Sequence, residues 1–323
     1  MRPFRFERAT DAEQAVALIA DEPEARYLGG GTNLVDLMRL GVETPAVLVD
    51  VARLDGAPGE IEDTPSGGLR IGAAVSNSDL AVDPRVRTRY PVLSEAVLHG
   101  ASGQLRNLAT TGGNLLQRTR CAYFQDVTKP CNKREPGSGC PAREGDHRNL
   151  AILGWSEACV ATHPSDLAVA LAAVDAVVHT SRRSLTLVEL QRLPGDEPER
   201  DTVLEHGELL EAVELPPLAF ARNSAYVKVR ERASFSFAVV SLAAALDVSA
   251  GTVRDVRLAL GGVAHKPWRA TRVEDLLRGG SATVDAFARA ADVELAQARP
   301  LRDNRYKVPI ARNLIVRTLM ELA

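Results

Sequence analysis

The sequence lacks the features that would place the protein in a membrane, on nucleic acid or on an export route. None of its apolar runs approaches the roughly 20 residues that a membrane-spanning helix needs. The formal net charge is −3 and the sequence pI is about 6.1, so the chain has no surplus of basic residues for binding nucleic acid. The residues after Met1 pass into an amphipathic segment rather than the apolar core of a signal peptide. We therefore expect a protein made in the cytoplasm, without an export signal of its own.

Cysteine is scarce and unevenly placed. The chain has four, and all of them fall within residues 121–159, with the spacing Cys-x9-Cys-x8-Cys-x18-Cys. The Cys-x2–4-Cys pairs of structural zinc sites are missing, and the spacing also departs from the runs found in ferredoxins. The missing export signal disfavours disulfides. Four cysteines gathered in one segment nevertheless indicate a shared task. They are Cys121, Cys131, Cys140 and Cys159.

At 323 residues the chain is long enough for two domains with stable cores. Apolar periodicity predicts a first helix over residues 12–20, with Thr10 and Glu13 as its capping box. Periodicity disappears between residues 117 and 148, where seven Lys/Arg accompany four Asp/Glu. A loop of this length is usually functional or disordered, and its three cysteines favour a function. The other elements expected in this part are strands at 25–28, 46–51, 69–75, 158–162 and 176–180, and helices at 34–40, up to 99 and from 165.

The last hundred or so residues follow a different pattern. Strands are expected at 225–230, 238–248 and 253–261, with a Ser-Ala-Gly turn at 249–251, and helices follow to the end. Antiparallel strands followed by helices are typical of an α+β unit. We place the domain boundary near 216–223, which divides the chain into residues 1–220 and residues 221–323.

Two glycine-rich turns are the strongest candidates for ligand binding. Gly29-Gly-Gly31 lies between a predicted strand and a predicted helix, and Thr110-Thr-Gly-Gly-Asn114 follows about 80 residues later. Bare backbone N–H groups in such turns suit a pyrophosphate, which side chains would keep away. The first turn is not a Rossmann fingerprint, because Leu34 occupies the last glycine position, and it is not a P-loop. Either turn alone is also typical of a simple chain reversal. Two in one domain suit a long dinucleotide that needs several backbone clamps.

Together these turns resemble the FAD subunit of the molybdenum hydroxylases, a family that includes xanthine dehydrogenase, carbon monoxide dehydrogenase medium subunits and bacterial aldehyde oxidoreductases. Within the family, the cysteine-bearing segment is similar to the FAD subunit of periplasmic aldehyde oxidoreductase. The resemblance extends over essentially the whole chain. It is carried by Leu28-Gly-Gly-Gly-Thr-Asn-Leu34, Leu105-Arg-Asn-Leu-Ala-Thr-Thr-Gly-Gly-Asn-Leu115, Ile71-Gly-Ala-Ala-Val-Ser76, Gln117-Arg-Thr-Arg-Cys-Ala-Tyr-Phe124, Thr162-His-Pro-Ser-Asp166 and Tyr226-Val-Lys-Val-Arg230.

The resemblance implies an α+β fold. A vanillyl-alcohol-oxidase-like (PCMH-type) FAD-binding domain of two subdomains would carry an insertion at about 117–159. A C-terminal α+β domain like that of the carbon monoxide dehydrogenase flavoprotein would follow it.

The resemblance also implies the residues that hold FAD. Asp166 would accept a hydrogen bond from a ribose or a ring N–H, and Lys228 would place a positive charge near a phosphate or the reduced flavin. Taken alone, Asp166 also fits a helix N-cap and Lys228 a solvated charge on a strand. The implied contacts are Leu28, Gly29, Gly30, Gly31, Thr32, Asn33, Leu34, Thr110, Gly112, Gly113, Asn114, Asp166 and Lys228.

For the four cysteines the resemblance implies one [4Fe–4S] cluster, since some family members with such an insertion carry one. Zinc, and inert or disulfide-bonded cysteines, are the alternatives. His147 and His163 are expected to be solvated loop residues rather than ligands. Nearby basic residues would offset the charge of the thiolates, namely Lys129, Lys133, Arg134 and Arg143.

The function implied is electron transfer. The chain would receive electrons from a [2Fe–2S] small subunit, supplied by a molybdopterin-binding large subunit that oxidises an aldehyde or N-heterocycle. It would pass them to an external acceptor. No Ser/His/Asp set or carboxylate pair indicates hydrolysis, and no molybdenum site is visible. Two other functions are considered: a self-sufficient FAD-dependent oxidase or reductase, and a metal-stapled interaction protein without enzymatic activity. The expected location is the cytoplasm, or the periplasm if a partner carries the export signal.

Overall fold

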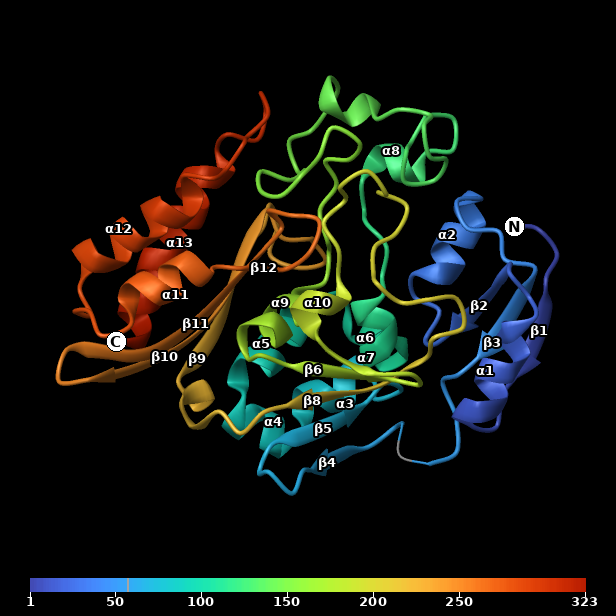
Figure 1. The fold of residues 1–323 in the computed structure, drawn as a ribbon, viewed down its shortest axis with the longest axis horizontal. Coiled ribbons are helices and arrows are strands. Elements are labelled where there is room, and N and C mark those ends of the chain that lie inside the picture. Colours follow the sequence, from blue (N-terminus) through green and yellow to red (C-terminus); the bar gives the residue numbers. More distant parts are fainter. Residues whose placement is uncertain (57) are drawn as a thin grey trace.

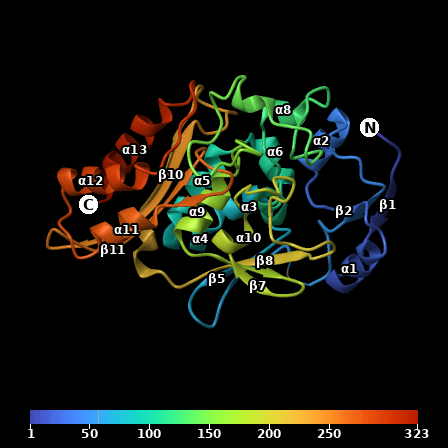
Figure 2. The same ribbon diagram turned by 45° about the horizontal axis from the view of Figure 1, so that its top comes forward.

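The structure, a computed structural model, describes residues 1–56 and 58–323. Three β-sheets follow one another through the molecule, and the two ends of the chain lie on opposite sides (Figure 1). The view in Figure 2 keeps this order, with the N-terminal sheet at one end and the C-terminal helices at the other. Among the described residues, no helix is both long and apolar enough to cross a bilayer.

The N-terminal sheet is small and parallel. Its middle strand, β3, pairs with β1 on one side and β2 on the other. The first glycine-rich turn connects β2 to α2, as expected. The elements of this unit are β1 (Arg5–Arg8), α1 (Ala12–Ala20), β2 (Ala25–Leu28), α2 (Leu34–Leu40) and β3 (Val47–Asp50).

The cap of α1 differs from the prediction. Asp11 has the extended N-cap conformation, and its carboxylate accepts a hydrogen bond from the Gln14 N–H at 2.8 Å. Because Asp11 offers a carboxylate one residue closer to the helix, Thr10 is displaced from the cap, and its N–H donates to Gln14 Oε1 instead. The capping box of Thr10 and Glu13 is therefore wrong, whereas the bounds of the helix are confirmed.

The middle sheet has five antiparallel strands in the order β4-β5-β8-β6-β7. Its core includes α5 and α9, and every residue of α9 is buried. The elements are β4 (Ile61–Asp63), β5 (Leu69–Gly72), α3 (Asn77–Val82), α4 (Pro84–Arg89), α5 (Pro91–His99), α6 (Gly103–Leu108), α7 (Thr111–Leu115), α9 (Asp166–Ala173), β6 (Val177–Thr180), β7 (Ser184–Thr186), α10 (Leu187–Leu190) and β8 (Leu210–Leu215).

Strand β5 ends earlier than the sequence predicts, and the reason lies in the second glycine-rich turn. The carbonyl of Ala73 accepts a hydrogen bond from the Gly112 N–H, and the carbonyl of Val75 accepts one from the Thr111 N–H, both at 2.9 Å. These carbonyls are thereby withdrawn from the sheet. The second turn is fixed directly to the end of a buried strand.

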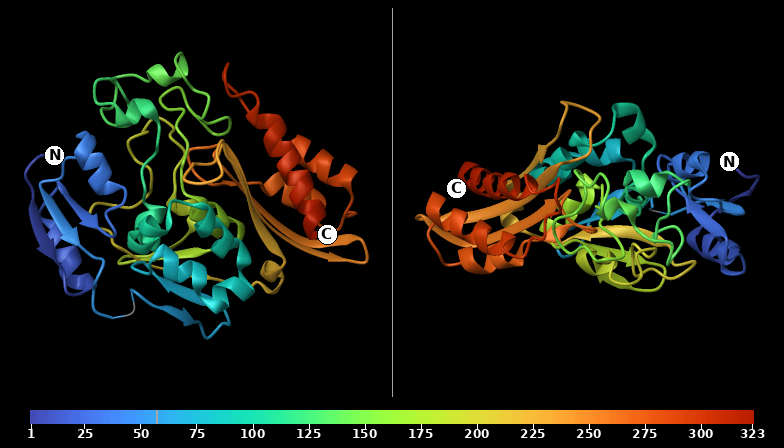
Figure 3. Two further views of the ribbon diagram at one scale, coloured as in Figure 1. Left: turned by 180° about the vertical axis from the view of Figure 1, so that it is seen from behind. Right: turned by 90° about the horizontal axis from the view of Figure 1, so that it is seen from above.

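The insertion between α7 and α9 is largely irregular and projects at the top of Figure 1. It contains α8 (Ala122–Gln125) and a 3-10 turn at Pro141–Arg143. The strand expected at 158–162 is wrong. Its backbone is paired with other irregular chain instead, with the Val160 carbonyl accepting from the Ala151 N–H. Seen from behind and from above in Figure 3, the insertion bridges the N-terminal and C-terminal parts.

The C-terminal unit is a four-stranded antiparallel sheet in the order β12-β11-β10-β9, followed by helices. The hairpin turn between β10 and β11 has Ala250 and Gly251 at φ of 49° and 76°, the geometry of a two-residue hairpin loop. The predicted turn is confirmed. The elements are η2 (Ala219–Arg222), β9 (Ser224–Val229), β10 (Val240–Ser249), β11 (Thr252–Gly261), β12 (Trp268–Arg269), α11 (Thr271–Leu277), α12 (Val284–Leu295) and α13 (Lys307–Leu322).

Both faces of this sheet are buried. Ala243 and Ala259 belong to the core shared with α5 and α9, whereas Leu242 and Leu258 belong to the core under α11, α12 and α13. This double burial explains the unbroken apolar run in β10, which a sheet with one wet face would not need. The sheet is therefore the layer that joins the middle unit to the C-terminal helices.

Candidate functional site

A cavity of about 490 Å³ lies between the N-terminal sheet and the middle sheet, where both glycine-rich turns meet. Seven consecutive residues of the first turn, Leu28 to Leu34, line it. The second turn contributes Thr110, Gly112 and Gly113, but not Asn114. The structure thus brings together ten of the thirteen residues predicted to contact FAD.

The two turns pack against each other, and this contact explains the glycines. A Cβ on Gly30 would lie 1.7 Å from the carbonyl oxygen of Leu108. Gly31 has a φ of 72°, in the left-handed region that favours glycine. Gly30 is therefore required by the contact with the chain before the second turn, in addition to any ligand.

Hydrogen-bond donors in the first turn are left without protein partners. Within the described residues, no acceptor takes a hydrogen bond from the backbone N–H of Gly29, Gly30, Gly31 or Thr32. The side-chain Nδ2 of Asn33 is buried and also has no partner there. A buried donor such as Asn33 Nδ2 is rarely left unsatisfied, and the half-buried N–H groups beside it line the same cavity, so together they fit an anionic, oxygen-rich ligand such as a diphosphate.

The second turn is held more tightly by the protein. The side chain of Thr110 accepts a hydrogen bond from the Gly113 N–H at 3.1 Å. Asn114 Oδ1 accepts from Gln117 Nε2 and, at 2.5 Å, from the hydroxyl of Ser165. Asn114 therefore faces the start of α9, next to Asp166, rather than the main cavity.

Asp166 and Lys228 form a buried pair at 2.7 Å. The second oxygen of Asp166 accepts from the Tyr226 hydroxyl at 2.5 Å, and Lys228 also donates to the His99 carbonyl. Burial and the nearby Asp166 raise the pKa of Tyr226 well above its usual value, so the phenol stays a donor. The cap of α9 is Ser165, and the Lys228 side chain is only 1% exposed. Neither the N-cap reading of Asp166 nor the solvated reading of Lys228 holds.

Asp166 also lines a second cavity, of about 440 Å³, and the loop that connects β9 and β10 forms part of its wall. Arg120 and Phe237 line it too, with the guanidinium 5.2 Å from the ring centroid. Burial lowers the pKa of Arg120, whose Nε has no partner among the described residues. Arg120 was not predicted as a site residue. Its position directly before Cys121, the first predicted metal ligand, was the signal that could have identified it. The role of Asp166 and Lys228 as FAD contacts stays a prediction.

All four cysteines line one small cavity of about 10 Å³ in the insertion, and all are free thiols. Burial raises the pKa of Cys121 to about 11 and of Cys159 to about 12, and it raises the pKa of Cys140 as well. Across residues 1–56 and 58–323, no group of three or more His, Cys, Asp or Glu side chains is arranged to hold a single metal ion. The cavity therefore gathers the predicted thiols without forming a ready-made ion site.

His147 and His163 lie outside this cavity, but they are not solvated loop residues. His147 is 2% exposed, and its Nε2 accepts a hydrogen bond from the Asp303 N–H. Burial lowers the pKa of His163 to about 4, and its Nε2 contacts the side chain of Gln191 at 2.9 Å. Both rings serve as internal hydrogen-bonding groups. The expectation that they are solvated is wrong.

A series of contacts joins the cavity at the glycine-rich turns to the cysteine cavity. Asn33 Oδ1 accepts a hydrogen bond from the Arg118 N–H at 2.8 Å. The Arg118 side chain pairs with Glu43 and with Asp201, each at 2.5 Å. Asp201 in turn accepts from Lys133, which lines the cysteine cavity. The first glycine-rich turn and the cysteines are thus connected through one carboxylate.

Two family models together cover almost the whole chain. Residues 2–218 match the FAD binding domain in molybdopterin dehydrogenase, and residues 225–322 match the CO dehydrogenase flavoprotein C-terminal domain.

Individual relatives agree with these matches. The aldehyde oxidoreductase FAD-binding subunit PaoB of Escherichia coli strain K12 is 48% identical over 326 residues, covering 99% of this chain and 98% of the relative. The glyceraldehyde dehydrogenase medium chain of Sulfolobus acidocaldarius is 24% identical, covering 99% and 98%. Both relatives are subunits of oxidoreductases.

Solved structures show the same fold. A carbon monoxide dehydrogenase chain from Oligotropha carboxidovorans matches with a TM-score of 0.77 and 21% identity, covering 100% of this chain and 99% of that one. A quinoline 2-oxidoreductase chain from Pseudomonas putida 86 matches with a TM-score of 0.74 and 22% identity, covering 99% and 97%. The predicted fold class is confirmed.

Proposed function

This chain belongs to the FAD-binding subunits of the molybdopterin dehydrogenases, and on that premise we propose that it transfers electrons within an aldehyde-oxidising complex. It would hold FAD between its glycine-rich turns and an iron–sulfur cluster on its four cysteines. The relative that shares nearly half of its residues is an aldehyde oxidoreductase subunit, which favours an aldehyde as the substrate of the complex.

One observation carries the flavin half of the proposal. The first turn presents unpaired backbone N–H groups and the orphaned Asn33 Nδ2 to a cavity that the second turn closes. When bound there, FAD supplies one- and two-electron redox chemistry. The chain itself binds and orients the diphosphate through these donors. The apolar side chains of Leu54 and Leu209 line the same cavity and exclude water from it.

The cluster half is supported by the donor set. Four thiols line one cavity whose described lining includes no His, Asp or Glu, and sulfur ligation is typical of iron–sulfur clusters and of some zinc sites. A zinc ion needs four ligands about 2.3 Å from one point, an arrangement that no described group provides. A cluster carries its own iron and sulfide between the thiolates, so it suits ligands that surround a cavity without converging. Binding of a cluster would require the walls of this small cavity to move apart.

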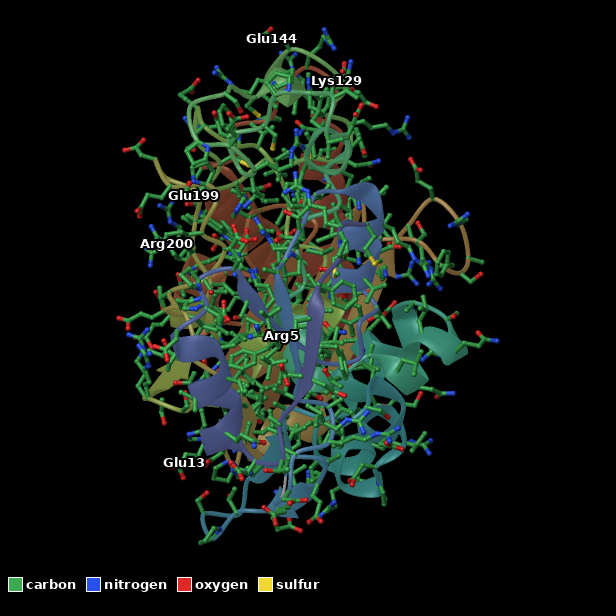
Figure 4. The ribbon with its side chains drawn as sticks, turned by 90° about the vertical axis from the view of Figure 1, so that its right-hand side faces the viewer. Arg5, Glu13, Lys129, Glu144, Glu199 and Arg200 are labelled. Carbon is green, nitrogen blue, oxygen red and sulfur yellow. The ribbon has the colours of Figure 1, made fainter. Side chains whose placement is uncertain are left out.

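The partners follow from the premise. We propose a molybdopterin-binding large subunit, a [2Fe–2S] small subunit and an external electron acceptor. The complex would work in the cytoplasm, or in the periplasm if a partner carries the export signal. Tyr123 and the basic surface of the insertion are proposed as the docking face, since aromatic residues are enriched at interface cores. In Figure 4, Lys129 and Glu144 mark the outer tip of this insertion, beyond Glu199 and Arg200.

Metal and flavin analysis of anaerobically purified protein tests the assignment. The full chain should contain about one FAD together with iron, and Cys131→Ser should lose iron and its broad visible absorbance while FAD remains. Val127→Ser, an exposed position in the same insertion, is the matched control and should keep both. Stoichiometric zinc without iron, in protein made with ample iron, would reject the cluster.

The rival reading is a self-sufficient flavin oxidase. Such an enzyme would need positioned acid–base groups for its own substrate. If the isolated chain oxidised aldehydes at ordinary enzymatic rates, roughly 1–10³ per second, the electron-transfer proposal would be wrong. Co-expression with the neighbouring genes should instead yield a complex that oxidises the aldehyde only when the molybdopterin subunit is present.

A further inference from the structure

The four basic residues predicted to offset the thiolate charge have very different environments. Lys133 is 2% exposed, and it is the one charged side chain that lines the cysteine cavity in the described part of the chain. Lys129 is exposed, Arg134 donates to the carbonyls of Tyr123 and Phe124, and Arg143 pairs with Glu157 at the surface. Among these four, Lys133 is the one that lies against the thiols inside the protein.

All three protons of the Lys133 ammonium have acceptors. They are the carbonyl of Pro198 at 2.5 Å, Asp201 Oδ1 at 2.5 Å and His265 Nε2 at 2.8 Å. No donor is left for a cysteine sulfur. The lysine therefore acts on the thiols through its charge and not as a hydrogen-bond partner.

Two polar side chains, Asp201 and His265, contact the Lys133 Nζ. His265 Nδ1 donates to the Ala161 carbonyl at 3.3 Å, which leaves the Nε2 lone pair for the lysine. Burial and the adjacent ammonium lower the pKa of His265, so this ring is neutral. Burial alone would raise the pKa of Asp201, but the adjacent Lys133 and Arg118 side chains hold it well below its usual range. Lys133 thus lines the cysteine cavity while it is paired with a carboxylate that does not line it.

We propose that Lys133 is a positioning charge for the cysteine site, held there by Asp201, which raises the reduction potential of the cluster bound by the four cysteines. This inference rests on the proposed iron–sulfur cluster. Net charge around a cluster is one of the factors that set its potential. A buried cation stabilises the reduced form, which carries one more negative charge than the oxidised form. Asp201 opposes this effect from farther away, since it does not line the cavity.

Removal of the Lys133 charge and removal of the Asp201 charge should shift the reduction potential of the cluster in opposite directions. Redox titration of the anaerobic full chain, followed by electron paramagnetic resonance, measures the cluster potential. Lys133→Met should shift it to a lower value, because the cation is lost. Asp201→Asn should shift it to a higher value, because the opposing charge is lost while the side-chain shape is kept. Lys129→Met, in the same insertion but exposed, should leave the potential unchanged.

Lys133→Met should still fold, because Asp201 keeps Arg118 and His265 as partners. If it nevertheless lost its iron, Lys133→Arg would decide. Recovered iron with a wild-type potential supports the proposal, and loss of iron in both variants overturns it in favour of a purely structural lysine. Shifts of the same sign in Lys133→Met and Asp201→Asn, or no shift, also overturn it. Wild-type protein without iron would instead reject the cluster itself.

Discussion

The glycine-turn cavity and the cysteine cavity are built in opposite ways. The first is wide, about 490 Å³, and is lined by two glycine-rich turns at the ends of regular elements. The second is small, about 10 Å³, and is surrounded by largely irregular chain. Side chains from distant segments hold that chain in place, among them Asp201, His265 and Asn304. A backbone site depends on close approach between turns, whereas a side-chain site depends on buried polar contacts. Mutations should therefore break the two sites by different means.

The largest effect is expected from Gly30→Val. Its side chain would meet the backbone of Leu108, so the two glycine-rich turns must separate and flavin should be lost, while iron at the cysteines stays near the wild-type amount. Flavin absorbance per protein and iron content measure this. Gly103→Val is the control, since nothing lies within 4 Å of its Cβ. Gly113→Ala should be milder, because it meets only the rotatable hydroxyl of Thr110. Normal flavin in Gly30→Val would contradict the account.

The second-largest effect is expected when the buried pair of Asp166 and Lys228 is broken. Lys228→Met leaves the carboxylate buried with Tyr226 as its one remaining side-chain partner, and such changes cost about 3–5 kcal/mol of unfolding free energy. Urea unfolding of flavin-free protein measures it without the contribution of ligand binding. The double variant Lys228→Met/Asp166→Leu should recover most of the loss. A cost near zero for the single change would show that the pair is not buried in solution.

Lys307 provides a pH test on the C-terminal side of the insertion. Burial lowers its pKa to about 7, and its ammonium donates only to the carbonyls of Leu150 and Gly262. Between pH 7 and the ordinary lysine value of 10.5, the unfolded chain binds a proton that the folded chain does not. Stability should therefore rise with pH across this window, because the cost of burying the charge disappears.

In Lys307→Met the slope of unfolding free energy against pH should be shallower across that window. Unfolding curves at several pH values in both proteins give the comparison. Arg317→Met, an exposed change on the same helix, should keep the wild-type slope. Equal slopes in wild type and Lys307→Met would mean that the lysine keeps an ordinary pKa.

The smallest effects are expected for two tyrosines, one near the glycine-rich turns and one in the insertion. Tyr27, near the glycine turns, donates to the buried Gly207 carbonyl at 2.9 Å, whereas Tyr123, in the insertion, accepts from the exposed Asp146 N–H at 2.8 Å. Tyr27→Phe should cost about 1–2 kcal/mol, since a buried acceptor loses its partner. Tyr123→Phe should cost under about 1 kcal/mol, because water replaces the hydroxyl. Thermal unfolding of both variants decides, and the reverse order would be inconsistent with the burial described here.

The regular elements and the glycine turns were predictable because their signals are local. Helix periodicity and the glycines gave α1, β2 and α2 their observed bounds. The strand predicted at 158–162 was wrong for a physical reason. Its apolar residues are buried, as in a strand, but they pack among the cysteines instead of pairing in a sheet. Apolar character alone does not distinguish these two cases.

The polar contacts around the cysteines were not predictable. Asp201 and His265 reach Lys133 across 68 and 132 residues of sequence, and no periodicity relates positions so far apart. For Lys228, predicted as a FAD contact, a solvated position was the alternative, because a charge on a strand usually faces water. The second face of its sheet is covered by α5 and α9, and only the three-dimensional packing shows this.

The order of residues along the chain has a consequence for biogenesis. Asn304 donates to the carbonyls of His147, Leu150 and Ala151, and Lys307 holds Leu150 as well. These contacts fix the segment that leads to the fourth cysteine, yet a ribosome adds Asn304 about 145 residues after Cys159. The glycine turns, by contrast, have all their residues by position 114. Both glycine-rich turns are thus complete in sequence early in synthesis, although their cavity also needs residues 208–211, whereas the cysteine cavity takes its final shape only after the last helix has begun to emerge.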